Sequence, residues 1–222
     1  MLHKTRGVVF RFTKYGETSI IVNIFTELFG LQGYIVNGVR TKSSKNKVAL
    51  YQPLTLLDLV VYHRENANLN RISEAKCLHP YKTIPIDIRK SAVAVFINEV
   101  INKAIREESH ASELCHFIIN SFITLDNLTN GIENFHLIFL LKLSRLLGFG
   151  AHNTEEVMGV RATDVETEKM LDLLIQTDYS PTVSMTNNQR RVILDLLLKF
   201  YGDHIDSFGE MKSIQVLREI IG

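Results

Sequence analysis

The chain has 222 residues, 45% of them hydrophobic and 22% charged, which is the composition of an ordinary soluble globular protein with one large or two small domains. Its net charge of +1 indicates no partner, but the charge is unevenly distributed. Residues 1–80 contain 11 Lys and Arg against 5 Asp and Glu, whereas residues 81–222 contain 14 against 19. The basic first part hints at a nucleic-acid or membrane surface, and uneven scatter of solvated charge is the alternative reading.

Cysteine content and hydropathy limit which cross-links, metal sites and cellular compartment we expect for this chain. Cys77 and Cys115 are far apart and form no CxxC pair, so neither a disulfide framework nor a cysteine zinc site is expected. Sparse cysteine fits a reducing cytoplasm. The N-terminus has no apolar run of signal-peptide length, and Lys142 and Arg145 interrupt the most apolar stretch, residues 137–150. That stretch predicts a buried helix, and we expect no membrane association.

Short runs of β-branched and aromatic residues predict strands in the first part of the chain. Partial alternation and turn residues delimit four of them, over residues 6–13, 18–26, 30–39 and 54–63, and a fifth over about 68–78. No connection between them is a helix-length crossover, so we expect a small closed barrel rather than a parallel sheet.

The hydrophobic period changes to that of a helix after His79-Pro80-Tyr81. Apolar residues then recur every four positions from Ala92 to Ala104. Further helices are expected over residues 111–126, 132–148, 165–177, 187–202 and 210–221, and Gly148-Phe149-Gly150 is a helix stop. The fold class is therefore α+β, with a five-stranded barrel domain at 1–80 and an all-helical domain at 81–222.

No catalytic motif is present: the chain contains no GxSxG, HExxH or P-loop pattern. The best metal cluster, His110, Glu113 and His116, is spread over roughly 600° of helix rotation and cannot share one face. We therefore expect no enzyme, no cofactor and no bound metal.

A basic connection between two expected strands is the best candidate binding element. It carries Arg40, Lys42, Lys45 and Lys47 and no acid. Such side chains bind phosphate, and loops of this kind border the nucleic-acid groove of OB-fold barrels, although a solubilising loop has the same composition. Weaker candidates for phosphate contact are Arg6, Arg11 and Lys14. Nearby aromatic residues could stack on bases, but most aromatic residues of a small barrel belong to its core: these are Tyr15, Phe29, Tyr34, Tyr51 and Tyr62.

Several short segments, in order along nearly the whole chain, resemble the RecO family of bacterial recombination mediators. They are residues 15–19 (YGETS) with 24–27 (IFTE), 38–40 (GVR) with 52–54 (QPL), 139–141 (FLL) with 147–150 (LGFG), and 211–213 (MKS). The resemblance implies an N-terminal OB-fold and a C-terminal helical domain. It also implies a cytoplasmic, nucleoid-associated protein that binds single- and double-stranded DNA and anneals complementary strands. Its implied partners are RecR and the C-terminal tail of single-strand binding protein, and its implied role is to help load RecA.

One departure concerns zinc: many members of that family carry four cysteines after the LGFG segment, and this chain has none there. Segment 151–165 is therefore expected to do without metal. For the partner tail we expect a pocket in the helical domain, with Phe139, Leu143 and Phe149 as walls and Lys142 or Arg145 as the carboxylate contact. Ordinary helical core is the alternative for the apolar residues. Three rival functions remain open: an RNA-binding module, a protein adaptor without nucleic-acid binding, and a hydrolase without a recognisable motif.

Overall fold

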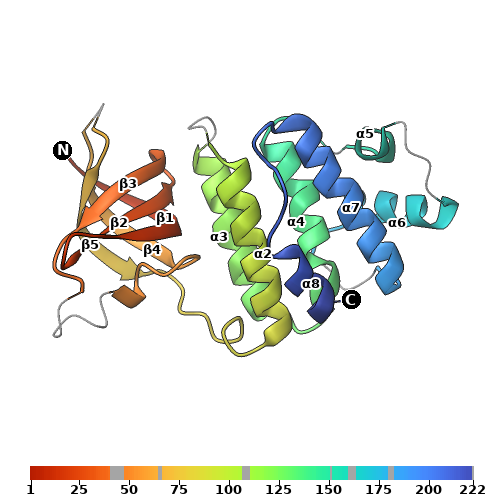
Figure 1. Cartoon of the computed structure of the whole chain (residues 1–222), viewed down its shortest axis with the longest axis horizontal. Helices are drawn as coiled ribbons and strands as arrows, with labels where there is room; N and C mark the ends of the chain where they lie inside the picture. Colours follow the sequence, from red (N-terminus) through yellow and green to blue (C-terminus); the bar gives the residue numbers. More distant parts are fainter. Residues whose placement is uncertain are drawn as a thin grey trace. The chain divides into compact units, whose positions relative to one another are not determined.

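The computed structural model describes residues 1–40, 48–64, 67–106, 111–150, 152–159, 164–179 and 183–221 (Figure 1). The chain forms two compact units. The first contains Met1–Tyr81 and Ile105–Ile123, and the second contains Lys82–Ala104 and Thr124–Gly222. The domain boundary expected after residue 80 stays a prediction, because compact packing units and folding domains need not coincide.

The first unit contains five strands that close into a barrel in the order β1-β2-β3-β5-β4 (Figure 1). The strands are β1 Leu2–Tyr15, β2 Ser19–Thr26, β3 Gly30–Val36, β4 Leu56–Tyr62 and β5 Asn70–Cys77. All neighbours are antiparallel except β3 and β5, which pair in parallel. This is an OB-fold barrel, as predicted. Alternate residues fill its interior, among them Val9, Ile20, Val22, Ile24, Tyr34, Leu57, Leu59 and Val61.

Strand β1 closes the barrel because it pairs with both of its neighbours. Residues 2–8 pair with β4 and residues 7–15 pair with β2. A bulge between Val9 and Arg11, within the pairing with β2, inserts one extra residue. The bulge reverses the alternation, so Val9 points into the core while Arg11 is exposed on the outside.

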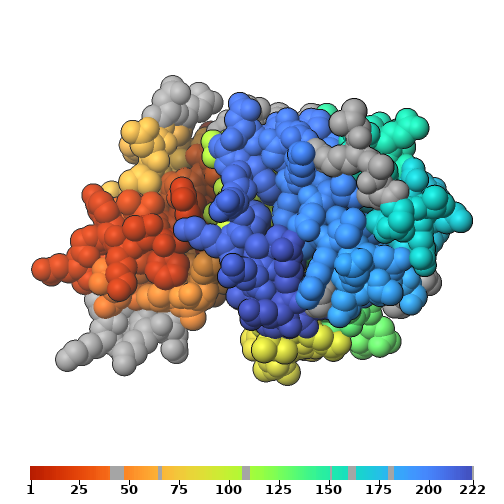
Figure 2. Space-filling model, turned by 45° about the vertical axis from the view of Figure 1, so that its right-hand side comes forward, coloured from red at the N-terminus to blue at the C-terminus, as the bar shows by residue number. Residues whose placement is uncertain are grey.

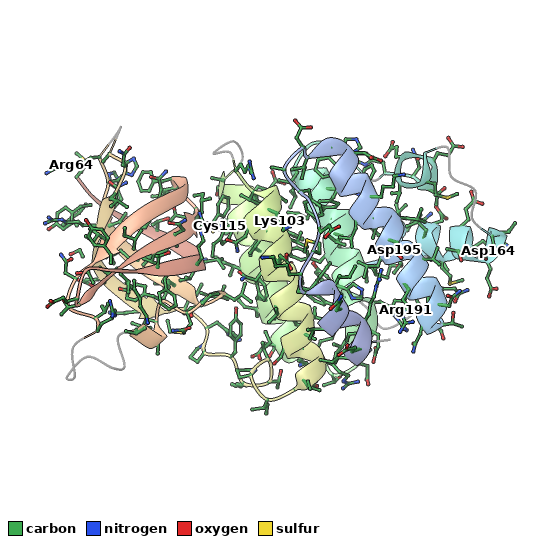
Figure 3. All side chains as sticks on the ribbon, viewed as in Figure 1. Arg64, Lys103, Cys115, Asp164, Arg191 and Asp195 are labelled. Atoms are coloured by element: carbon green, nitrogen blue, oxygen red, sulfur yellow. The ribbon has the colours of Figure 1, made fainter. Side chains whose placement is uncertain are left out.

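Helix α3 (Ala111–Asn127) covers one outer side of the barrel with the residues that belong to the first unit. The rings of Phe10 and Phe25 stack there with centroids 5.6 Å apart, and both side chains are buried although they point away from the barrel interior. The Cys115 thiol on α3 lies 3.7 Å from the Phe25 carbonyl oxygen (Figure 3). Burial raises the pKa of Cys115 to about 12, an effect to which Glu27 adds, so the thiol stays protonated and packs as a small apolar group.

The second unit is helical, as predicted. Its helices are α2 Ile88–Ala104, α4 Ile132–Leu146, α5 Thr154–Met158, α6 Val165–Gln176, α7 Asn187–His204 and α8 Ile214–Ile221. Helix α4 is buried on nearly every side, which explains why it is the most apolar stretch of the chain. It ends where Gly148 and Gly150 both adopt positive φ, 83° and 73°. No helix in the described part of the chain is long and apolar enough to cross a membrane.

Candidate nucleic-acid interface

On the side of the barrel that carries Arg11, outward-facing residues of neighbouring strands line up in two rows. In one row, Arg11 lies opposite Asn23 on β2, which lies opposite Gly33 on β3. The next row runs from Thr13 through Ile21 and Ile35 to Arg71 on β5. Because neighbouring strands lie about 4.8 Å apart, these residues form one continuous surface, here called the outer face.

The outer face carries positive charge and no carboxylate among its described residues. Arg11 and Arg71 are exposed, while Ile21, Asn23 and Ile35 are half-buried. With its amide oxygen turned toward Arg11, Asn23 accepts hydrogen bonds from Arg11 Nε at 2.9 Å and Nη2 at 3.2 Å. This contact holds the guanidinium over the strands, where it can meet a phosphate.

The connection between β4 and β5 borders the outer face at Gly33. A Cβ atom on Gly33 would lie 3.1 Å from Leu69 Cδ2, so a side chain here would press against that connection. Tyr62, opposite Arg71 at the end of β4, is 48% exposed. An exposed ring beside an arginine is the arrangement that stacks on unpaired bases.

Arg40 lies at the opposite border, against the turn between β1 and β2. Its Nη1 donates to the Gly16 carbonyl oxygen at 3.0 Å, and its backbone amide donates to Thr18 O at 3.0 Å. Lys14 and Tyr15, in the last residues of β1, are exposed close to this turn. Three of the predicted phosphate contacts, Lys42, Lys45 and Lys47, lie outside the described residues.

Arg6 lies in a different part of the barrel surface. It lines a groove of about 560 Å³ on β1, β4 and β5, where its Nε is 3.8 Å from Asp58 Oδ1. The other charged residues of the groove are Lys4, Lys76, Glu27 and Glu74, so the cations there are matched by acids. Arg6 thus lies beside a carboxylate, whereas Arg11 is held by the neutral amide of Asn23.

Sequence reasoning missed Arg71 and Asn23 as members of the basic side. Both stand alone in the sequence, and only strand register places them beside Arg11. The available signal was the alternation of β2, in which Ile20, Val22 and Ile24 point inward and leave Asn23 outside.

The three apolar residues predicted to form the walls of a partner-tail pocket differ in how accessible they are. Phe139 and Leu143 on α4 are fully buried, so they belong to the helical core and offer no accessible wall. Phe149 is half-buried in an aromatic cluster, with its ring stacked on His204 at 4.9 Å and edge-on to Tyr201 at 5.1 Å. Of the three apolar residues, only Phe149 presents a ring that a partner can reach.

Both predicted carboxylate contacts already have partners within the helical unit. Lys142 Nζ forms an ion pair with Asp178 and lies 5.8 Å from the centre of the Tyr179 ring. Its hydrogen bond and charge lower the pKa of Asp178. Arg145 Nη2 donates to the Ile175 carbonyl oxygen at 2.7 Å. A tail carboxylate would have to replace Asp178 at Lys142.

Metal-ligating side chains do not gather in threes anywhere in the described ranges. His110 of the cluster considered above lies outside those ranges. His116 on α3 instead pairs with Glu27, with Nε2 3.1 Å from Oε1.

One unit is a closed OB-fold barrel and the other is a bundle of helices. The protein therefore belongs to the class in which an OB-fold barrel is joined to a helical domain. Residues 1–81 match the family model described as Recombination protein O N terminal, and residues 86–159 match Recombination protein O C terminal. The chain therefore belongs to the RecO family, a family of DNA repair proteins.

Curated relatives named DNA repair protein RecO are similar over nearly the full length. The chain is 33% identical to the protein of Bacteroides fragilis over 240 residues, covering 99% of each. It is 34% identical to that of Flavobacterium psychrophilum over 236 residues, covering 98% of each. It is 33% identical to that of Christiangramia forsetii over 247 residues, covering all of both.

Proposed function

We propose that this protein is a non-enzymatic recombination mediator that binds single- and double-stranded DNA and anneals complementary strands. Family membership supports the role in DNA repair. The single observation that carries the DNA-binding part is the outer face, where Arg11 and Arg71 flank half-buried apolar residues without a neighbouring carboxylate among the described residues.

Binding at the outer face would combine charge with stacking. Arg11, Arg71 and Arg40 would hold phosphates, and each contact would release counterions from the DNA. Ile21, Ile35 and Tyr62 offer apolar surface to the faces of bases. A strand held mainly by its phosphates keeps its base edges available for pairing, which is the property that annealing needs.

The protein partners of the proposed mediator are RecR and the C-terminal tail of single-strand binding protein, and its outcome is RecA loaded onto covered strands. The helical unit would receive the tail near Lys142 and Phe149. A cation suits a terminal carboxylate, and a half-buried ring can pack against a neighbouring aromatic side chain. Support for this placement is the half-buried Phe149 cluster and the exposed Asp178, which a stronger carboxylate ligand could displace.

A fluorescence titration tests the proposal against its rivals. Labelled oligo-dT and a folded RNA hairpin of equal length would each be titrated with the whole protein at two salt concentrations. We expect tighter binding to oligo-dT, weakened by salt. Tighter binding to the hairpin would favour an RNA-binding module, and no salt-sensitive binding to either would favour a protein adaptor. Lys169→Gln, on the exposed surface of α6, is the matched control for removal of a charge.

A further inference from the structure

A narrow pit lies between α4, α7 and α8 of the helical unit. Helices α7 and α8 lie side by side at the surface there (Figure 2). The space inside is small, about 10 Å³. Three arginines and a histidine line the pit, and no carboxylate does among the described residues; the lining is His136, Arg190, Arg191, Leu194, Leu217, Arg218 and Ile221.

Arg190 brings a buried positive charge to the pit. The residue is only 8% exposed, yet every hydrogen bond it makes to described residues ends on a neutral oxygen. Nε donates to Asn134 Oδ1 at 3.1 Å, Nη1 to Asn187 Oδ1 at 2.8 Å and Nη2 to Met185 O at 3.0 Å. A buried cation that forms no ion pair with a described carboxylate is costly, so this site favours a negative charge nearby.

Two polar atoms that belong to residues lining the same pit have no hydrogen-bond partner among the described residues. They are Nδ1 of His136 and Nε of Arg218, and both atoms are buried. Arg218 Nε–H is always a donor, and His136 Nδ1 is a donor in one tautomer. Burial lowers the pKa of His136 to about 3, with the nearby Arg190 charge as a second cause, so the ring is neutral and its Nδ1 can carry an N–H.

Two carboxylates that act on the lining arginines lie outside the pit. Asp195, one turn from Arg191 on α7 (Figure 3), pairs with Arg218 through Nη2 and leaves Nε unmet. Glu133, whose charge acts on Arg190 from a distance, pairs with Arg89 at 3.3 Å. Neither residue lines the pit.

We infer that this pit is a binding site for one small monovalent anion, held by the unpartnered N–H groups of His136 and Arg218 and by the charge of Arg190. A pit this small favours a small monovalent anion or a single carboxylate oxygen over the bulkier phosphate and sulfate ions. The apolar walls from Leu194, Leu217 and Ile221 favour an anion that loses its hydration easily, such as chloride or bromide, over fluoride. The anion would neutralise Arg190 and tie α8 to α4 and α7.

The test uses the whole protein and two readouts. The first is the linewidth of the ³⁵Cl NMR signal in dilute sodium chloride, and the second is the thermal midpoint in sodium chloride, bromide or fluoride at equal ionic strength. We expect protein-dependent broadening of the chloride signal and a higher midpoint in chloride or bromide than in fluoride. Anion binding raises the midpoint because the anion binds the folded state.

Variants distinguish anion binding in the pit from anion binding to other positively charged parts of the surface. Arg218→Met removes one donor from a partly exposed position, and Arg191→Met removes a second charge at the rim. We expect Arg218→Met to weaken chloride binding at least about tenfold, the loss of one charge-assisted hydrogen bond. Lys169→Met is the control and should behave as wild type. Equal broadening in wild type, Arg218→Met and Arg191→Met would overturn the inference.

A competition experiment distinguishes the source of the anion. Sodium acetate that displaces chloride and sharpens the signal would assign the site to carboxylates as well as halides. Broadening that persists in excess acetate would assign it to halides alone. Absence of any broadening in the wild-type protein would contradict the site itself.

Discussion

The carboxylate of Glu99 on α2 holds Ser213 at the start of α8. Glu99 Oε2 accepts hydrogen bonds from the Ser213 backbone amide at 2.8 Å and from its hydroxyl at 2.6 Å. Glu99 Oε1 accepts from the Lys212 amide at 2.8 Å, so one side chain caps the N-terminus of α8. One turn further along α2, Lys103 donates to the Phe208 carbonyl oxygen at 2.9 Å (Figure 3). Two residues of the MKS segment, Lys212 and Ser213, are thus anchored to α2.

Replacing Glu99 with Gln should lower the free energy of unfolding by about 1–3 kcal/mol, because the hydrogen bonds to a charged acceptor become weaker. Urea titration followed by circular dichroism measures the loss. Glu219→Gln removes an exposed carboxylate from α8 and serves as the control. A Glu99→Gln variant as stable as this control would show that the cap contributes nothing.

The same cap predicts a dependence on pH. Burial by itself would raise the pKa of Glu99, but hydrogen bonds from Ser213 and Lys212 and the charge of Lys103 bring it below its ordinary value. A depressed folded pKa stabilises the protein above the unfolded pKa of about 4.3, and that stability is lost as pH falls through the lower, folded value. The difference between wild type and Glu99→Gln should therefore shrink below about pH 4. A difference that stays constant from neutral to acid pH would argue against it.

Gly7 should not tolerate a methyl group. A Cβ atom there would lie 2.7 Å from Ile24 Cγ2 and 3.0 Å from the Phe25 carbonyl oxygen, both on the paired strand. Gly7→Ala should destabilise the barrel by about 1–3 kcal/mol through overpacking. Gly202→Ala on α7 meets nothing within 4 Å and should stabilise by about 0.5–1 kcal/mol. Thermal unfolding of both variants checks the pair, and a harmless Gly7→Ala would show that β1 and β2 can separate there.

A double change of Lys142 and Arg145 to Glu should weaken binding of an acidic peptide that ends in Phe. The new carboxylates repel the peptide, and the one that replaces the Lys142 ammonium would also face Asp178. Calorimetry with the whole protein measures the affinity, and Lys169→Glu controls for the change of net charge. If the double variant binds as tightly as the control, the tail docks elsewhere, and Phe149→Ala should then also leave the affinity unchanged.

Changing Arg40, Lys42, Lys45 and Lys47 together to Ala should weaken DNA binding and annealing similarly across DNA sequences, because phosphate contacts carry no base information. Thermal stability should change little, since exposed charges contribute little to folding. Strand annealing followed by fluorescence is the measurement. If the variant anneals strands at the wild-type rate, we would assign the phosphate contacts to the outer face alone.

The barrel and the helical unit could be predicted from the sequence, because the buried residues follow hydrophobic alternation in the strands and the helical period in the helices. Alternation over β2, for example, matches the inward set of Ile20, Val22 and Ile24. Strand β1 begins at Leu2, before the predicted start, because its first residues are mostly polar and show no apolar run. Helix α5 was not predicted, since Thr154–Met158 is too short to display a period.

The composition of the outer face could not be predicted, because it depends on a bulge and on strand register. Simple alternation from Val9 would turn Arg11 inward, and only the extra residue at the bulge exposes it beside Asn23. Arg71 joins the face through the parallel pairing of β5 with β3, a contact between distant segments. Burial of Phe139 and Leu143 likewise depends on which helices surround α4.

The most direct test of the account is the salt dependence of oligo-dT binding by wild type and by the double variant Arg11→Gln/Arg71→Gln. Six phosphate contacts, two from the outer face and four from the basic connection, predict a slope of log K against log[salt] of about −4 on single strands. Removing Arg11 and Arg71 should bring the slope to about −3 and weaken binding at low salt, while Lys169→Gln leaves both unchanged. A double variant with the wild-type slope and affinity would contradict the outer face as the DNA-binding surface.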